Sequence, residues 1–233
     1  PHQLTMTATP IPRTLAMTLY ADLDASIIDE LPPGRTPVQT VAISAERRAE
    51  VIERIRAACA EGRQAYWVCT LIEEMDPDPK AGARLELQAA EKTYAQLSAQ
   101  LPGLRIGLVH GRLKPAQKQA VMDAFKCGEL QLLVATTVIE VGLDVPQATL
   151  MVIEQAERFG LAQLHQLRGR VGRGAESSVC LLLRSGELSE TARERLALMR
   201  ETQDGFRLAE EDLRLRGGGE LLGTRQSGDT PFQ

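Results

Sequence analysis

Between residues 36 and 184 the sequence alternates short apolar runs with longer segments in which apolar side chains recur at helical spacing. The apolar runs are continuous, which indicates strands that are buried on both faces. Strands of this kind alternating with helices are typical of βαβ units, which build a parallel α/β sheet with helices on both faces. The predicted strands are residues 38–43, 64–69, 104–109, 130–135, 149–153 and 178–183.

Local signals mark the ends of two predicted helices. The first has Ser44 as its N-cap and stops at Gly62, whereas the second has Pro115 in its first turn and stops at Gly128. The segment 75–84 is rich in turn-forming residues and is expected to be a loop.

After Ser189 the pattern becomes helical without further strands. Two helices are expected, at about 189–202 and 204–216, and they would form a hairpin appended to the sheet domain. From Gly223 onward there is no periodicity, which predicts an irregular arm. We therefore assign 37–186 to the α/β domain and 187–233 to the hairpin and arm.

Composition indicates a soluble globular protein. The 233 residues are 43% hydrophobic and 25% charged, and no apolar run approaches the roughly 20 residues that a membrane-spanning helix needs. The four cysteines have no Cys-x-x-Cys spacing and all lie in or beside apolar patterns, as reduced core thiols do. We therefore expect a cytoplasmic protein. The three histidines are too scattered to form a zinc site, so no metal site is expected.

Charge and aromatic content limit how the chain can bind nucleic acid. The net charge is −4, so any such contact must be local. Only 3% of the residues are aromatic, which leaves few rings on which unpaired bases could stack. A nucleic-acid contact is thus expected to involve phosphates rather than bases.

The segment 163–174 places Arg168, Arg170 and Arg173 close together among glycines. The guanidinium group binds phosphate oxygens in a bidentate manner, and glycines allow the backbone to bend so that several such groups face one site. A polyphosphate partner is one interpretation. A solvated basic turn fits this segment equally well.

Polar residues also follow two of the predicted strands. His110 and Gly111 follow the third strand, and the segment 136–144 follows the fourth. Ligands of parallel α/β sheets collect at the carboxyl ends of strands, so we expect these segments and the arginines to gather at that edge. Taken alone, the segment 136–144 fits a strand-to-helix turn with capping threonines better than it fits a phosphate site.

Taken together, these segments resemble the second RecA-like motor domain of superfamily 2 helicases and translocases. The pattern of their motif VI is Gln-x-x-Gly-Arg-x-Gly-Arg. Its fixed places are filled here by Gln166, Gly169, Arg170, Gly172 and Arg173. The segment 135–146 is similar to motif V, and His110–Gly111 is similar to the motif before a DNA-contacting helix.

The resemblance implies roles for individual residues. Arg170 and Arg173 would act as arginine fingers on the γ-phosphate of ATP, and Gln166 would help to position the triphosphate. Gly142 and Asp144 would couple the nucleotide to DNA. A further set would contact DNA: His110, Gly111, Thr136 and Thr137.

The nucleotide-cradling half of such a motor is not found in these residues. Residues 7–14 resemble motif III, so we interpret 1–36 as the end of a first motor domain and an inter-domain linker. No Gly-x-x-x-x-Gly-Lys-Ser/Thr segment occurs. We expect ATP and Mg²⁺ to serve a longer protein, and this chain alone to be inactive and to hold neither tightly.

Two segments narrow the family. Residues 204–228 resemble the translocation motif shared by the RecG helicases and the transcription-repair coupling factor Mfd, and residues 22–37 resemble the RecG form of the linker. A RecG-type protein is an ATP-dependent translocase that regresses stalled forks and migrates Holliday junctions, in recombination and repair. In it, Arg195, Arg216 and Gln226 would transmit domain closure into movement along DNA.

The same resemblance implies partners and location. The partners would be branched double-stranded DNA and, within the same protein, a wedge domain and the first motor domain. A monomer in the bacterial cytoplasm, associated with the nucleoid and with no membrane, is expected. An Mfd-type translocase and a non-catalytic DNA- or protein-binding module are the alternatives.

Overall fold

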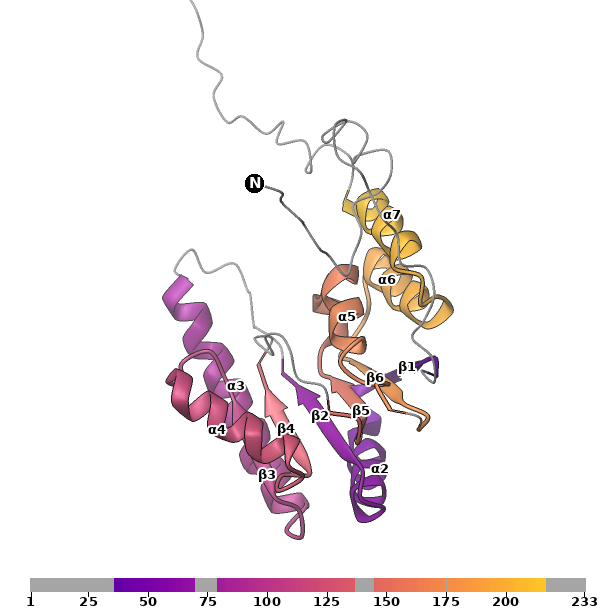
Figure 1. Ribbon diagram of the computed structural model, residues 1–233. Helices are drawn as coiled ribbons and strands as arrows, with labels where there is room; N and C mark the ends of the chain where they lie inside the picture. The colour runs from indigo at the N-terminus through magenta and orange to yellow at the C-terminus, as the bar shows by residue number, and fades with distance from the viewer. Residues whose placement is uncertain (1–35, 70–78, 137–144, 175, 217–233) are drawn as a thin grey trace, which may run out of the picture.

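The computed structural model describes residues 36–69, 79–136, 145–174 and 176–216, and it shows a six-stranded sheet in which every strand pair is parallel (Figure 1). The strand order is β1-β6-β5-β2-β4-β3. The strands are β1 (Gln39–Ser44), β2 (Gln64–Val68), β3 (Ile106–Val109), β4 (Leu132–Ala135), β5 (Ala148–Ile153) and β6 (Val179–Arg184). The predicted parallel α/β sheet is confirmed.

Helices cover both faces of this sheet. They are η1 (Ala45–Arg47), α2 (Arg48–Ala60), α3 (Pro79–Gln100), α4 (Pro115–Lys126), η2 (Ala156–Arg158), α5 (Leu161–Arg168), α6 (Glu190–Glu201) and α7 (Gly205–Arg216). Side chains of α2 and α3 pack on one face, and side chains of α4, α5, α6 and α7 join the core of the other face.

The central strands explain the apolar runs of the sequence. Every residue of β2, β4 and β5 is buried, because alternate side chains enter the two cores. In β2, for example, Tyr66 and Val68 enter one core while Ala65 and Trp67 enter the other. Burial on both faces is what removes the alternation of apolar and polar residues.

The predicted helix ends agree with the structure, with one correction. Ser44 accepts a hydrogen bond from the Glu46 N–H but caps the short η1 turn, which continues directly into α2. Gly62 and Gly128 take positive φ after α2 and α4. The prediction of a loop at 75–84 is wrong for residues 79–84, because α3 begins at Pro79. Proline is well suited to the first turn of a helix. Residues 75–78 lie outside the described residues.

The predicted helical hairpin is also confirmed. Ser189 caps α6 by accepting from the Ala192 N–H at 3.2 Å, and Asp204 accepts from the Phe206 N–H at 2.8 Å at the start of α7. The hairpin packs beside α5 (Figure 1). The predicted arm from Gly223 lies outside the described residues, and the domain limits stay predictions.

The expectation of four core thiols is wrong for one cysteine. Cys59, Cys69 and Cys180 are buried, but Cys127 is exposed just after α4. Burial raises the pKa of Cys59 to about 11, and it raises the pKa of Cys180 to about 12. Burial and the neighbouring Glu154 raise the pKa of Cys69 to about 12. In the part of the chain that the structure describes, no helix has the length and apolarity to cross a membrane.

Candidate functional site

Two predicted DNA-contacting residues lie side by side at the carboxyl edge of the sheet. β3 and β4 are paired with Val109 opposite Ala135, and the chain continues from these residues into His110 and Thr136. The Thr136 N–H donates to the Val109 carbonyl oxygen at 3.1 Å. The structure therefore brings His110, Gly111 and Thr136 together, as the sequence predicted.

The exposure of these residues differs. Gly111 is exposed and His110 is half-buried, with its Nδ1 accepting from the Arg112 N–H at 3.3 Å. Thr136 is only 2% exposed, and its hydroxyl has no hydrogen-bond partner within the described ranges. A buried unpaired hydroxyl is costly, so it needs a partner that the described chain does not supply. Thr137, Gly142 and Asp144 lie outside the described residues.

The arginine loop, residues 169–174, lies at the opposite edge of the sheet. A side chain added at Gly172 would meet Val38 and Ser178, which directly precede β1 and β6. One added at Gly174 would meet Pro146, which precedes β5. The loop is therefore at the amino ends of these strands, and the expectation that all three segments gather at the carboxyl edge is wrong. The reason is that α5 carries the chain back across the sheet to the start of β6.

The loop has a fixed backbone from which two arginines emerge. The Arg170 N–H donates to the Leu167 carbonyl oxygen at 3.0 Å, and the fully buried Val171 anchors the middle of the loop. Gly172 has φ 76°, a conformation that other residues rarely adopt. Arg173 is exposed and its Nε lies 3.5 Å from the Gly169 carbonyl oxygen.

Arg170 and Arg173 are available to an anion. Arg170 is partly exposed and Arg173 is exposed, and neither forms an ion pair within the part of the chain that the structure describes. Gln166 is exposed on the last turn of α5, just before the loop. These three residues could face one ligand, which agrees with their predicted roles without testing them.

Arg168 does not belong to this group. It is 3% exposed, and its Nη1 donates to the carbonyl oxygens of Met199 at 2.7 Å and Thr202 at 2.9 Å. Burial lowers its pKa. The idea of three arginines on one phosphate site is therefore corrected to two. A sequence signal for this existed, because Arg168 follows Leu161 and Leu164 at the spacing of a buried helix face.

Arg195 makes the converse connection from α6. Its Nη1 donates to the Phe159 carbonyl oxygen at 2.8 Å and its Nη2 to the Glu157 carbonyl oxygen at 3.2 Å, both in the segment before α5. Arg168 thus joins the C-terminal end of α5 to the end of α6, and Arg195 joins α6 to the segment that precedes α5. Arg216 is the last residue of α7, and Gln226 lies outside the described residues.

Sequence reasoning missed Gln203, in the turn between α6 and α7. Its side chain makes two hydrogen bonds to the backbone of Val38, at 3.1 and 3.3 Å. A backbone partner 165 positions away has no signature in the sequence, so no pattern could have revealed this contact.

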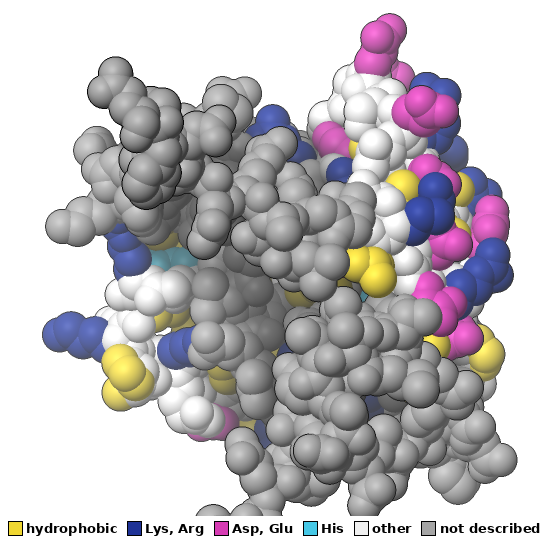
Figure 2. Space-filling model, turned by 90° about the horizontal axis from the view of Figure 1, so that it is seen from above, with side chains coloured by type: hydrophobic (Ala, Val, Ile, Leu, Met, Phe, Trp, Pro, Cys, Tyr) yellow, Lys and Arg dark blue, Asp and Glu magenta, His cyan; other side chains and the backbone are white. Residues whose placement is uncertain are grey.

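The flank formed by the hairpin carries mixed charge. Figure 2 shows Lys and Arg side chains interspersed there with Asp and Glu side chains. Arg214 pairs with Glu194 and Glu211, and Arg207 lies 3.8 Å from Glu201. Because opposite charges alternate, this flank offers no basic patch to nucleic acid. Among the described residues there is also no group of three or more side chains that could hold a metal ion.

Comparison with known proteins agrees with this arrangement. Residues 47–175 match the family described as the helicase conserved C-terminal domain. The chain is 66% identical over 234 residues to the ATP-dependent DNA helicase RecG of Escherichia coli (strain K12), covering 100% of this chain and 33% of that protein. The chain spans about a third of the length of the curated relatives it matches.

Comparison with solved structures also finds helicases. A structure of RecG bound to a three-way DNA junction is 47% identical, with a TM-score of 0.76, and the match covers 92% of this chain and 27% of that one. The yeast protein Dbp5, bound to RNA and ADP BeF3, is 13% identical with a TM-score of 0.56, over 88% of this chain and 51% of that one. The latter likeness supports the RecA-like fold alone.

Proposed function

This chain belongs to the family of the helicase conserved C-terminal domain and is similar over its whole length to the C-terminal third of RecG, and on that premise we propose that it is the second motor domain of an ATP-dependent helicase. Its substrate is branched double-stranded DNA, such as forks and Holliday junctions. The naming of relatives as ATP-dependent DNA helicases, and the solved RecG complex with a three-way junction, support this proposal.

The observation that carries the proposal is the geometry of the arginine loop. The side chains of Arg170 and Arg173 extend from a backbone that the buried Val171 holds in place. They form no ion pair with described residues. Such arginines can stabilise the charge that develops on a phosphoryl group during its transfer. The 233 residues contain no Walker A segment, so the nucleotide is held by another part of the longer protein, with Mg²⁺ as its metal.

DNA binds at the other edge of the sheet in this proposal. His110, Gly111, Thr136 and Thr137 contact the DNA backbone in this proposal, and of these Gly111 is exposed at this edge. The proposed coupling of nucleotide and DNA through Gly142 and Asp144 rests on the resemblance of residues 135–146 to motif V.

In this proposal the hairpin of α6 and α7 transmits the closure of the motor domains into movement along DNA. Arg195 fixes α6 to the segment before α5, which supports its role in coupling together with Arg216 and Gln226. We further propose that the protein works as a monomer in the bacterial cytoplasm, in association with the nucleoid.

Single substitutions in the full-length protein test the proposal. Arg170→Ala and Arg173→Ala should each lower the kcat of DNA-stimulated ATP hydrolysis by roughly 1,000-fold, while binding to forked DNA stays as in the wild type. Arg200→Ala, at an exposed position of α6, is the matched control. Unchanged ATP hydrolysis in both loop variants would instead mean a non-catalytic binding module.

A further inference from the structure

Gln203 occupies the open edge of the sheet at the start of β1. Its Nε2 donates to the Val38 carbonyl oxygen at 3.1 Å, and its Oε1 accepts from the Val38 N–H at 3.3 Å. On the other side, the Gln39 N–H donates to the Ser178 carbonyl oxygen at 2.9 Å. Successive backbone groups of a strand point to opposite sides, and β1 is an edge strand. The Gln203 amide thus takes the place of a neighbouring strand at Val38.

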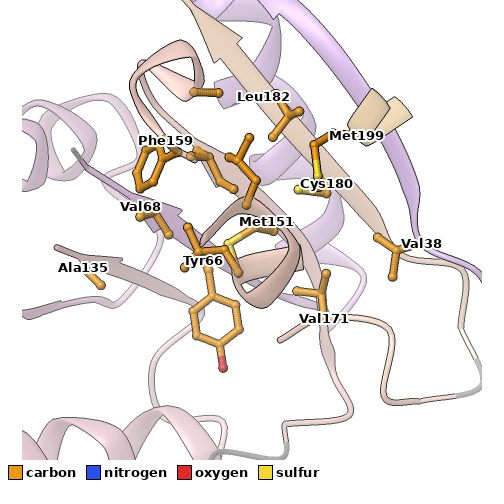
Figure 3. Packing of buried hydrophobic residues seen from close by; sticks show 14 of the residues in the cluster. Val38, Tyr66, Val68, Ala135, Met151, Phe159, Val171, Cys180, Leu182 and Met199 are labelled. Atoms are coloured by element: carbon orange, nitrogen blue, oxygen red, sulfur yellow. The ribbon is translucent and has the colours of Figure 1, made fainter. Parts of the chain in front are cut away.

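The side chain of Val38 lies against the arginine loop. Its Cγ2 is 2.6 Å from the point at which a Cβ would stand on Gly172, so it fills the space that any side chain there would need. Val38 is only 5% exposed and belongs to the same packed cluster as Val171 and Met199 (Figure 3). The loop cannot shift toward β1 unless Val38 moves as well.

Two further hydrogen bonds fix the start of β1 and the turn between α6 and α7. The Thr36 hydroxyl donates to the Glu176 carbonyl oxygen at 3.3 Å, so residues 36–38 run beside the chain that leaves the loop. Arg168 donates to the carbonyl oxygen of Thr202, the residue before Gln203. The turn between α6 and α7 is therefore hydrogen-bonded to α5 through Thr202 and to the start of β1 through Gln203.

We propose that Gln203 is a positioning residue of the motor: it holds the start of β1 against the arginine loop and thereby fixes where Arg170 and Arg173 point. Both hydrogen bonds of its side chain go to the backbone of Val38. The proposal rests on the proposed function, since it assigns to Gln203 an effect on catalysis that acts through these two arginines.

The test uses the full-length protein with Gln203→Met, which keeps the length of the side chain and removes both hydrogen bonds. The expected result is a fall in the kcat of DNA-stimulated ATP hydrolysis of roughly tenfold to a hundredfold, because small misplacements of catalytic groups cost about that much. The KM for ATP should stay unchanged, since the nucleotide is held elsewhere.

Gln64→Met is the matched control. Gln64 also binds two backbone groups, the carbonyl oxygens of Phe125 at 2.6 Å and Leu130 at 2.7 Å, but none in the arginine loop. It should lower the free energy of unfolding without lowering the kcat of the folded enzyme. If Gln203→Met does not fold, Gln203→Asn, which is too short to reach Val38, is measured in its place.

Three outcomes separate the two proposals. If Gln203→Met adds no further loss in a protein that lacks both Arg170 and Arg173, the effect acts through these arginines and the inference holds. If Gln203→Met behaves like Gln64→Met while the arginine variants lose activity, the inference is overturned and the proposed function stands. If the arginine variants keep full activity, the proposed function fails and the inference fails with it.

Discussion

Arg168, the last residue of α5, donates a hydrogen bond of 2.7 Å to the carbonyl oxygen of Met199 in the last turn of α6. The last carbonyl groups of a helix have no partner inside the helix, and they carry partial negative charge. A second hydrogen bond from Arg168 goes to the carbonyl oxygen of Thr202, the residue that directly follows α6. The end of α6 therefore supplies the negative environment for a buried guanidinium that has no carboxylate partner among the described residues.

Arg168→Met should lower the free energy of unfolding by about 2 to 4 kcal/mol, because it leaves the buried Met199 carbonyl oxygen and the partly buried Thr202 carbonyl oxygen without this donor. Urea unfolding followed by circular dichroism measures this change. Arg200→Met, at an exposed position of α6, should change the stability by less than about 0.5 kcal/mol. Equal stability of the two variants would show that Arg168 does not hold the hairpin.

The contrast between Arg168 and its neighbours shows what the sequence can predict. The strands were predictable because burial on both faces leaves a local trace in residue type. The role of Arg170 and Arg173 could be suggested because a short motif contains them. The direction of Arg168 depends on backbone groups more than 30 positions away, and backbone groups have no signature in the sequence.

The arrangement of the two edges was not predictable by the same reasoning. Loops that follow strands collect at the carboxyl edge, and this holds for His110 and Thr136. The arginine loop follows a helix rather than a strand, so it lies where the next strand begins. Reading the connection between α5 and β6 as a helix-to-strand loop would have placed it correctly.

Gly172→Ala should destabilise the protein more than Gly128→Ala does. Both glycines have positive φ, at 76° and 77°, so both alanines carry the same conformational cost of about 1 to 2 kcal/mol. Gly172 also has Val38 within 2.6 Å of the added Cβ, whereas Gly128 has no atom within 4 Å. The difference between the two variants in urea unfolding isolates the contact with Val38.

A second substitution checks the cause. Shortening the neighbour with Val38→Ala should recover part of the stability lost in Gly172→Ala, because it removes the atom that clashes. If the double variant is no more stable than the additive sum of both single variants, the contact with Val38 is not the origin of the loss.

Arg195→Ala should impair movement along DNA more than it impairs ATP hydrolysis. The substitution removes the donors to the Phe159 and Glu157 carbonyl oxygens and so loosens α6 from the segment before α5, while the arginine loop keeps its own contacts. Fork regression and DNA-stimulated ATP hydrolysis by the full-length protein measure the two effects. Arg193→Ala, exposed on the same helix, is the control.

The same separation of activities is expected for Arg216→Ala and Gln226→Ala, if these residues couple hydrolysis to movement. Equal loss of both activities in all three variants would mean that the hairpin serves only as a scaffold.

Thiol reagents should modify Cys127 first in the folded protein. It is the exposed cysteine among four, whereas Cys59, Cys69 and Cys180 are buried and have raised pKa values, which keep them in the unreactive thiol form. Counting the modified thiols by mass spectrometry before and after adding urea measures this. Labelling of Cys180 as fast as Cys127 in native conditions would contradict the packing described above.

Burial of the thiols also predicts that stability decreases at high pH. The pKa of Cys180 is raised from 9.0 to about 12, so above pH 9 the unfolded chain loses this proton while the folded chain keeps it. The stabilising contribution is complete below pH 9 and is lost as the pH rises toward 12. Between these two pH values, one such thiol lowers the free energy of unfolding by about 1.4 kcal/mol for each unit by which the pH rises. Replacing Cys180 with Ala should therefore make the dependence of the unfolding free energy on pH shallower by about that amount.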